Sequence, residues 1–373
     1  MHGDKKKIVI FYATAGIGHK KAAMAIKDAF YGMNRKDVLF EDVLDYTNTF
    51  FKSSYNSVYL FLIRYLPTIW GLCYYLLDNR FVYAALRPLR RLVNRINSGP
   101  LVRFLLNKRP DAVICTHFMS VEVVSYLKKK GVLKTRLVSV ITDYKAHRFW
   151  LSDYVDDYIA GADYTKEDLI RRGVPAQKIL TFGIPCAGRF STSHDADRIK
   201  SQIGLLKDKN TIFVLGGGFG IGPIRSIAYH MDRLKEDFQC IVVCGYNTKL
   251  YNEISKMAQS SAHTFKVYGF VDNVDELMAV SDLLISKPGG ITVTEALASA
   301  LPMIVINPIP GQEMRNYKFL ERYNAALKAK SPKETVEIIK GLLVSGKLGA
   351  LKENIKKIRQ VNSAERIAGE IVK

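Results

Sequence analysis

The sequence has few cysteines and no long uncharged hydrophobic run, and these two features argue against several classes of protein. Its five cysteines show no paired zinc-ligand spacing, and Cys240 and Cys244 flank an apolar run typical of a strand. We therefore expect buried reduced thiols and neither disulfides nor a metal site. The longest apolar stretch, Tyr65 to Leu77, has 13 residues and contains Pro67, whereas a membrane-spanning helix needs about 20.

Acidic residues are also scarce relative to basic ones. The 373 residues include 55 Lys and Arg but only 35 Asp and Glu, which gives a net charge of +20. Such a charge attracts nucleic acid or an anionic membrane surface. A hydrophobic content of 48% and this length predict a globular protein with two domains. The basic start leads into only a short apolar run before a glycine loop, so we expect a first strand and not a signal peptide.

The N-terminal half opens with a strand, a glycine turn and a helix. Lys7–Tyr12 is strand-like, Ala13–His19 is the turn and Lys20–Tyr31 has a helical pattern. His19 at the turn is a helix-capping residue or a catalytic base, and the residues alone leave both open. Further strands are predicted at Phe40–Asp45, Asp111–Thr116, Leu137–Thr142, Val155–Ala160 and Ile179–Gly183.

Polar residues follow two of these strands. His117 and Asp143 stand at the carboxyl ends, where parallel α/β sheets place ligands, and Thr142–Trp150 continues the polar cluster. Asp156 and Asp157 could form a metal pair, but the alternation around them favours the polar ends of a short strand.

Residues 46–110 differ from the rest of the chain. Twelve aromatic residues lie between Tyr46 and Tyr83, and residues 46–110 contain ten Lys or Arg but one acid, Asp78. Apolar and basic residues at helical intervals, without a spanning length, are typical of helices in a membrane interface, and Arg87–Arg95 is the most basic run. A helical insertion with a solvated basic face is the alternative. Nucleic acid ranks third, because base-stacking aromatics normally lie on sheets or grooves.

The C-terminal half repeats the order of strand, glycine loop and helix. Thr211–Leu215 leads into the glycine loop Gly216–Pro223, but no acid ends the following strand, Ile241–Cys244, to bind a ribose as in dinucleotide sites. Strands are also predicted at Phe265–Phe270 and Leu283–Ser286. The last residues, Lys352–Lys373, have the pattern of one basic amphipathic helix.

Residues 286–316 indicate a ligand site. The turn Pro288–Gly290 precedes a helix that we expect Thr292 and Thr294 to cap, with Glu295 in its first turn. A strand at Met303–Ile306 and a polar loop at Pro308–Glu313 follow. Because a glycine turn at a helix N-terminus binds phosphate, and the next loop offers groups for hydroxyls, this pattern suggests a nucleotide-sugar site.

Together these motifs resemble the diacylglycerol glycosyltransferases, a family of GT-B enzymes that includes bacterial processive glucosyltransferases and plant monogalactosyldiacylglycerol synthases. The resemblance rests on motifs spread over most of the chain, which are Gly16–His19, Thr142–Trp150, Gly183–Pro185, Gly216–Gly218, Gly269–Asn273, Lys287–Glu295 and Pro310–Glu313. It implies an α/β GT-B fold with two Rossmann-like domains facing across a cleft. We expect residues 1–184 to form the acceptor domain, 185–355 the donor domain and 356–373 a helix packing back on the first. Phe219 departs from some plant relatives, which have an acid there.

The resemblance also implies residue roles. In the N-terminal half, His19 is the expected base, with Asp143 also catalytic and Gly18, His147 and Trp150 around the acceptor. In the C-terminal half, the expected contacts to UDP are Gly217, Gly218, Phe270, Val271, Gly289, Gly290, Ile291, Thr292 and Glu295. The donor sugar is expected on Gln312, Glu313 and Asn316. No metal or other cofactor is expected, because helix N-termini can stabilise the leaving diphosphate.

The implied reaction moves a hexose, glucose in preference to galactose, from a UDP-sugar to the 3-hydroxyl of diacylglycerol with inversion. The implied enzyme is peripheral on the inner face of the cell membrane and binds an anionic lipid surface but no nucleic acid. A polyprenyl diphosphate acceptor is the nearest alternative, and a UDP-sugar epimerase or a non-catalytic sensor belongs to a different class. The residues predict neither the second hexose addition nor the oligomeric state.

Overall fold

The computed structural model describes residues 6–14, 16–218, 220 and 222–373, so Phe219 lies outside the described residues. The chain divides into two compact units. Unit 1 comprises residues 1–188, 309–315 and 362–373, and unit 2 comprises residues 189–308 and 316–361. Residues 309–315 therefore belong to unit 1, whereas the sequence pattern led us to expect them in the donor domain.

Unit 1 is built on a six-stranded parallel sheet in the order β2-β1-β3-β4-β5-β6. Its strands are β1 (Ile8–Tyr12), β2 (Leu39–Asp42), β3 (Ala112–Cys115), β4 (Arg136–Val140), β5 (Asp157–Ile159) and β6 (Ile179–Leu180). Two apolar clusters, one containing Val9 and Phe11 and the other Ile8 and Ile10, occupy the two faces. Such runs of apolar residues are expected in a parallel sheet covered on both sides.

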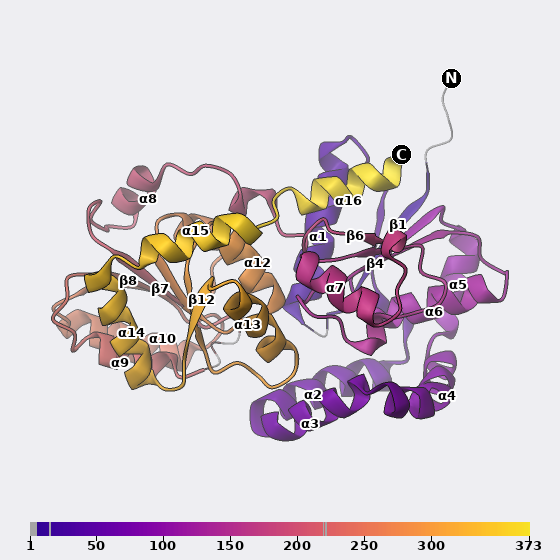
Figure 1. Cartoon of the computed structure of the whole chain (residues 1–373), viewed down its shortest axis with the longest axis horizontal. Helices are drawn as coiled ribbons and strands as arrows, with labels where there is room; N and C mark the ends of the chain where they lie inside the picture. The colour runs from indigo at the N-terminus through magenta and orange to yellow at the C-terminus, as the bar shows by residue number, and fades with distance from the viewer. Residues whose placement is uncertain (1–5, 15, 219, 221) are drawn as a thin grey trace. The chain divides into compact units, whose positions relative to one another are not determined.

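Unit 1 also contains helices and short 3-10 turns, most of which connect these strands. They are α1 (Ile17–Gly32), η1 (Val43–Tyr46), α2 (Thr49–Tyr65), α3 (Pro67–Asp78), α4 (Arg80–Asn97), α5 (Gly99–Lys108), α6 (Phe118–Lys129), η2 (Arg148–Trp150), α7 (Asp163–Arg171), η3 (Ala176–Lys178), η4 (Gly188–Phe190, which extends into unit 2) and α16 (Ser363–Val372). Figure 1 shows α16 against α1, although they lie near opposite ends of the chain. Ile367 and Ile371 of α16 share a buried cluster with Ile26 and Phe30 of α1.

The aromatic and basic segment forms α2 to α5, each with a start encoded in the sequence. Asn48 accepts a hydrogen bond from the N–H of Phe51 at 2.7 Å and so caps α2, and Asn79 caps α4 through Phe81 at 2.9 Å. Pro67 stands at the first position of α3, where its missing N–H removes no helical hydrogen bond. The helical character expected of residues 46–110 is thus present in α2 to α5.

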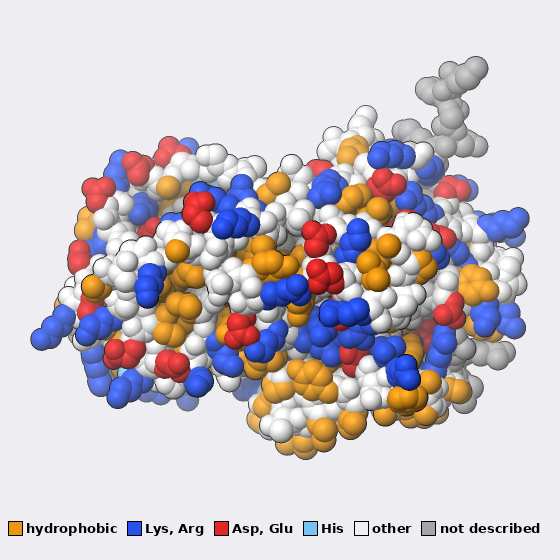
Figure 2. All heavy atoms as spheres, viewed as in Figure 1, with side chains coloured by type: hydrophobic (Ala, Val, Ile, Leu, Met, Phe, Trp, Pro, Cys, Tyr) orange, Lys and Arg blue, Asp and Glu red, His pale blue; other side chains and the backbone are white. Residues whose placement is uncertain are grey.

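An apolar surface covers α2, α3 and α4. Figure 2 shows hydrophobic side chains gathered over these helices with Lys and Arg beside them. Its exposed members are Val58, Phe61, Tyr65, Leu66, Ile69, Leu72, Tyr75, Leu76, Phe81, Leu86, Leu89 and Val93. Among the described residues, no helix has the length and hydrophobicity needed to cross a membrane.

Unit 2 contains a second six-stranded parallel sheet in the order β12-β11-β10-β7-β8-β9. Its strands are β7 (Thr211–Leu215), β8 (Gln239–Val243), β9 (Thr264–Tyr268), β10 (Leu283–Ser286), β11 (Met303–Ile306) and β12 (Ala326–Ala329). Its helices are α8 (Ala196–Gln202), α9 (Ile224–Met231), α10 (Thr248–Ser260), α11 (Val274–Ala279), α12 (Gly290–Ala298), α14 (Pro332–Ser345) and α15 (Leu348–Ile358). Helix α13 (Gln312–Arg322) begins in unit 1 and continues into unit 2.

The prediction of one continuous C-terminal helix is wrong. Helix α15 ends at Ile358, and α16 starts at Ser363 after Asn362, which has a left-handed backbone with φ of 56°. Asparagine tolerates this conformation better than most residues. The periodicity of the sequence continues across the break, because both helices are amphipathic.

Candidate active site

His19 lies in the first turn of α1, at the carboxyl end of the unit 1 sheet. Its Nδ1 is 2.7 Å from the carbonyl oxygen of Thr116 and 3.1 Å from Oγ1 of Thr142. A carbonyl oxygen can only accept a hydrogen bond, so Nδ1 carries the proton. The neutral ring therefore has its lone pair on Nε2, which is the atom able to accept a proton from a substrate.

The surroundings of His19 keep its ring uncharged. Burial lowers the pKa of His19 to about 4, and the hydrogen bond to Thr116 offsets only part of this effect. The ring of His117 packs edge-on at a centroid distance of 4.9 Å, and its own pKa is lowered well below the usual value by burial and by His19. The imidazole of His19 is thus neutral throughout the physiological pH range.

The other N-terminal residues with expected roles lie in two places, Gly18 in α1 and the rest in the segment from β4 to the end of η2. Gly18 and Asp143 are half-buried, whereas Trp150 is only 3% exposed, with its ring centroid 6.2 Å from that of His19. His147 is also buried. Its Nδ1 accepts from the N–H of Phe149 at 3.2 Å, so Nε2 donates to the carbonyl oxygen of Tyr74 at 3.0 Å. His147 therefore links this loop to α3.

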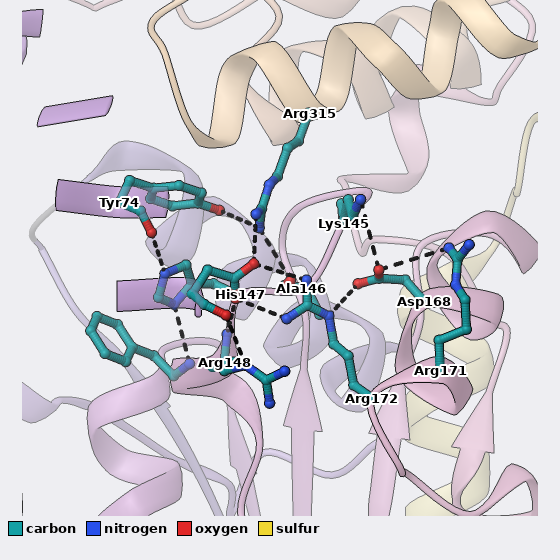
Figure 3. Close-up of polar contacts among 11 residues, drawn as sticks. Tyr74, Lys145, Ala146, His147, Arg148, Asp168, Arg171, Arg172 and Arg315 are labelled. Carbon is teal, nitrogen blue, oxygen red and sulfur yellow. Dashed lines mark hydrogen bonds and ion pairs between the residues drawn. The ribbon is translucent and has the colours of Figure 1, made fainter. Parts of the chain in front are cut away.

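A buried ion cluster beside this loop was not among the expected site residues. Asp78 of α3 accepts two hydrogen bonds from Arg172, at 2.8 and 2.9 Å, and one from Arg315 at 2.5 Å. Figure 3 shows Arg315 reaching from α13 towards Tyr74 and Arg172. Burial alone raises the pKa of Asp78, but the hydrogen bond from Arg172 and the charge of Arg315 outweigh it and lower the pKa to about 2. The signal in the sequence was that Asp78 is the one acid among ten basic residues.

In unit 2, the turn after β10 leads directly into α12. Gly289 is the residue before the first helical turn, and no side chain caps it. Gly290, Ile291 and Thr292 then form the first turn, where backbone N–H groups lack helical partners and suit an anion. The expected capping by Thr292 and Thr294 is wrong because the helix starts earlier; the hydroxyl of Thr294 donates to the carbonyl oxygen of Gly290 at 2.8 Å.

Glu295 accordingly lies in the interior of α12 and not in its first turn. Its side chain is buried, with a residue exposure of 3%. A carboxylate in such a position must be hydrogen-bonded to be tolerated. This placement differs from the expected first-turn position, where a carboxylate would interact with the helix dipole.

The glycine loop after β7 packs against the turn after β8. The N–H of Gly216 donates to Val243 at 3.0 Å, and the N–H of Tyr246 donates to Gly218 at 2.9 Å, next to Gly217. The exposed rings of Tyr246 and Phe270 stack at 4.5 Å with an interplanar angle of 10°. Val271 follows at a half-buried position.

The three residues expected on the donor sugar all lie in the first two turns of α13, and the boundary between the two units falls within this helix. Gln312 and Glu313 lie in unit 1, and Asn316 lies in unit 2. The Oε1 atom of Gln312 accepts from Nε1 of Trp70 at 3.2 Å, and Oε2 of Glu313 accepts from the N–H of Ile309 at 2.7 Å. Asn316 is fully buried and donates to the carbonyl oxygen of Pro288 at 3.1 Å, so it supports the turn before α12.

Residues 6–14, 16–218, 220 and 222–373 contain no cluster of three or more His, Cys, Asp or Glu suited to a metal ion. Asp156 and Asp157 instead pair with cations. Asp156 contacts Lys128, and Asp157 accepts from Arg136 at 2.7 Å. Strand β5 starts at Asp157, in agreement with the strand interpretation of this pair.

Comparison with known proteins defines the family. Residues 19–186 match the family model for monogalactosyldiacylglycerol (MGDG) synthase, and residues 211–370 match the glycosyltransferase family 28 C-terminal domain. A processive diacylglycerol beta-glucosyltransferase of Bacillus licheniformis is 30% identical over 371 residues, which cover 98% of this chain and 94% of the relative.

Solved structures confirm the expected fold. MurG of Acinetobacter baumannii has a TM-score of 0.62 at 14% identity, and Anabaena HepE in complex with UDP-glucose has a TM-score of 0.57 at 11% identity. Each comparison covers 98% of this chain and 99% of the other. The chain therefore belongs to the diacylglycerol glycosyltransferases of glycosyltransferase family 28 and has a GT-B fold with two Rossmann-like units.

Proposed function

We propose that this enzyme transfers glucose from UDP-glucose to the 3-hydroxyl of 1,2-diacylglycerol and inverts the anomeric carbon to give a β-glycolipid. The observation that carries the proposal is the 30% identity, over nearly the whole chain, to a relative named for diacylglycerol and β-glucosyl transfer. The related fold of HepE in complex with UDP-glucose supports the donor class.

In the proposed step, the diacylglycerol hydroxyl oxygen attacks C1 of glucose while the bond from C1 to the UDP oxygen breaks. The hydroxyl proton passes to Nε2 of His19, and UDP leaves with the bonding electron pair. The hydrogen bond from Nδ1 to Thr116 supports this role, because it orients the ring and leaves Nε2 basic. Asp143 at the same sheet edge is the proposed second catalytic residue, with Gly18 and Trp150 around the acceptor.

Residues of unit 2 are proposed to bind UDP. The free first-turn amides of α12, together with Gly217 and Gly218, suit the diphosphate, and the buried Glu295 suits the ribose hydroxyls. The backbone at Phe270 and Val271 is proposed to receive the uracil. Because the helix N-terminus can stabilise charge on the leaving diphosphate, we propose that the reaction needs no metal ion.

We further propose that the apolar surface over α2 to α4 docks on an anionic membrane at its cytoplasmic face. Large apolar side chains such as Leu72 and Phe81 are 60% and 68% exposed, and Arg64 and Arg80 are exposed beside them. Two arginines of the basic run Arg87–Arg95 already pair with acids of the protein, Arg87 with Asp153 and Arg90 with Glu122. They therefore contribute less to the attraction of an anionic surface than the sequence alone suggests. Exposed apolar groups with basic neighbours suit a membrane interface, which combines an apolar interior with a negatively charged surface.

The decisive test is a donor screen with diacylglycerol in vesicles that contain an anionic phospholipid. UDP-glucose, UDP-galactose and UDP-N-acetylglucosamine are compared, and the products are analysed by mass and linkage. The expected product is a β-glucosyl diacylglycerol. Because the matching family model is described as monogalactosyldiacylglycerol synthase, a galactosyl product would identify that enzyme instead. UDP released without lipid would indicate an epimerase or hydrolase, UDP-hexose binding without turnover would indicate a sensor, and transfer only to a polyprenyl diphosphate would identify that acceptor.

A further inference from the structure

We propose that Trp70 and Arg315 are positioning residues for the donor sugar, and that they act by holding Gln312 on helix α3. This inference rests on the proposed function, in which Gln312 contacts the transferred hexose. Residues 309–315 belong to unit 1, and all the contacts that support the proposal lie within that unit.

The first support is close packing at two glycines, one in α3 and one in segment 309–315. A Cβ atom added to Gly71 would lie 2.4 Å from Cβ of Pro310, and one added to Gly311 would lie 2.9 Å from the ring of Tyr74. Glycine inside a helix is unfavourable by about 0.5–1 kcal/mol relative to alanine. Close packing explains why glycine occupies position 71 despite this cost. With a side chain at Gly71, the backbone of α3 could not approach segment 309–315 so closely.

The second support is a set of polar contacts at both ends of the segment. Nε1 of Trp70 donates to Oε1 of Gln312 at 3.2 Å, which determines how the carboxamide of Gln312 is turned. Arg315 donates to Asp78 at 2.5 Å and to the carbonyl oxygen of Ala146 at 3.4 Å, and its guanidinium lies 4.8 Å from the ring centroid of Tyr74. Figure 3 shows this side chain surrounded by groups from α3 and the loop before η2.

The third support is that Asp78 is itself immobilised. It receives two hydrogen bonds from Arg172 and one from the N–H of Arg148 at 2.9 Å, so it offers Arg315 a fixed carboxylate. A planar guanidinium held by a fixed carboxylate and a carbonyl has one orientation. The start of α13, where Gln312 lies, is thereby held in one place relative to α3.

The contacts to segment 309–315 and the exposed apolar surface lie on two different faces of α3. Residues 70, 71, 74 and 78 of α3 contact segment 309–315, and they repeat at the spacing of one helical face. Ile69, Leu72 and Leu76 repeat on the opposite face and are exposed. A single helix thus presents apolar residues outwards while its other face holds the segment that carries Gln312.

The test compares binding of UDP-glucose with binding of UDP by calorimetry, without lipid. Trp70→Phe keeps an aromatic ring, although a smaller one, and removes the indole N–H that donates to Gln312. Arg315→Met removes the guanidinium while leaving the Asp78–Arg172 pair. We expect the Kd of UDP-glucose to rise about fivefold for Trp70→Phe and about tenfold for Arg315→Met, as for one lost neutral and one lost charged hydrogen bond. The Kd of UDP, which has no sugar, should stay within twofold of wild type. Arg315→Lys should recover part of the UDP-glucose affinity.

Tyr126→Phe and Arg103→Met serve as matched controls at exposed positions of α6 and α5, and both should bind UDP-glucose like wild type. Equal weakening of UDP and UDP-glucose, or no weakening of either, would overturn the positioning role. If Arg315→Met does not fold, Trp70→Phe alone decides the question. Failure of the proposed function is separate, because it would appear in the wild type as an absence of UDP-glucose binding or of glucosyl transfer.

Discussion

The pKa of His19 makes a quantitative prediction about the pH dependence of turnover. An imidazole with a pKa near 4 is about 97% neutral at pH 5.5, whereas one with the ordinary value of 6.5 would be only about 9% neutral. Because only the neutral ring can accept the proton of the acceptor hydroxyl, kcat/KM should change little between pH 7.5 and 5.5. The unperturbed histidine would lose about tenfold over the same range.

The assay measures kcat/KM for glucosyl transfer to diacylglycerol in mixed micelles from pH 5 to pH 9. UDP affinity is followed in the same buffers, so that any change in donor binding is separated from loss of the base. Thr142→Val offers an informative variant, because it removes the hydroxyl 3.1 Å from Nδ1 but leaves the Thr116 carbonyl that defines the tautomer. Its pH profile should keep the same shape.

A fall in kcat/KM on the acid side with a midpoint near pH 6.5, while UDP affinity stays constant, would refute this account of His19. The companion variant is His19→Ala, which should bind UDP normally and lose at least a hundredfold in kcat, the usual contribution of a general base. Wild-type turnover in His19→Ala would remove His19 from the mechanism altogether.

Four further predictions concern other parts of the chain. Burial lowers the pKa of His147 to about 4, so this histidine binds a proton more readily in the unfolded chain. The free energy of unfolding should therefore fall as the pH drops from about 6.5 towards 4, by up to about 1.4 kcal/mol per pH unit. In denaturant titrations of His147→Gln, the free energy of unfolding should depend less steeply on pH. Leu72→Glu should abolish flotation with anionic vesicles at low salt but not UDP binding; unchanged flotation would exclude α3 from the docking surface. Glu295→Ala should weaken UDP binding roughly tenfold or more in calorimetry, because charged hydrogen bonds each contribute about 1.5–3 kcal/mol. Gly71→Ala should lower stability by about 1–3 kcal/mol in denaturant unfolding, since its Cβ would overlap Pro310, whereas a helix-propensity effect alone would raise it.

Much of the fold could be predicted because it depends on local patterns. Short apolar runs such as Leu283–Ser286 became buried parallel strands, and the glycine turn before His19 became the start of α1. Errors arose where local signals compete. Thr292 and Thr294 have good capping side chains, yet α12 starts at Gly290, because the backbone already turns at Gly289 after a buried strand. At Asn362 the amphipathic period continued while the backbone changed direction.

The sequence by itself determined the two β/α halves, the family and the residues proposed to bind donor and acceptor, because each depends on neighbours within a few positions. Only the tertiary structure decided how distant groups pair. Asp78 and Arg315 are 237 residues apart, and Trp70 and Gln312 are 242 apart. No local pattern indicates that a loop following β11 belongs with a helix of the N-terminal unit. The path of the chain brings them together, and burial then requires that the charge of Asp78 be neutralised by Arg172 and Arg315.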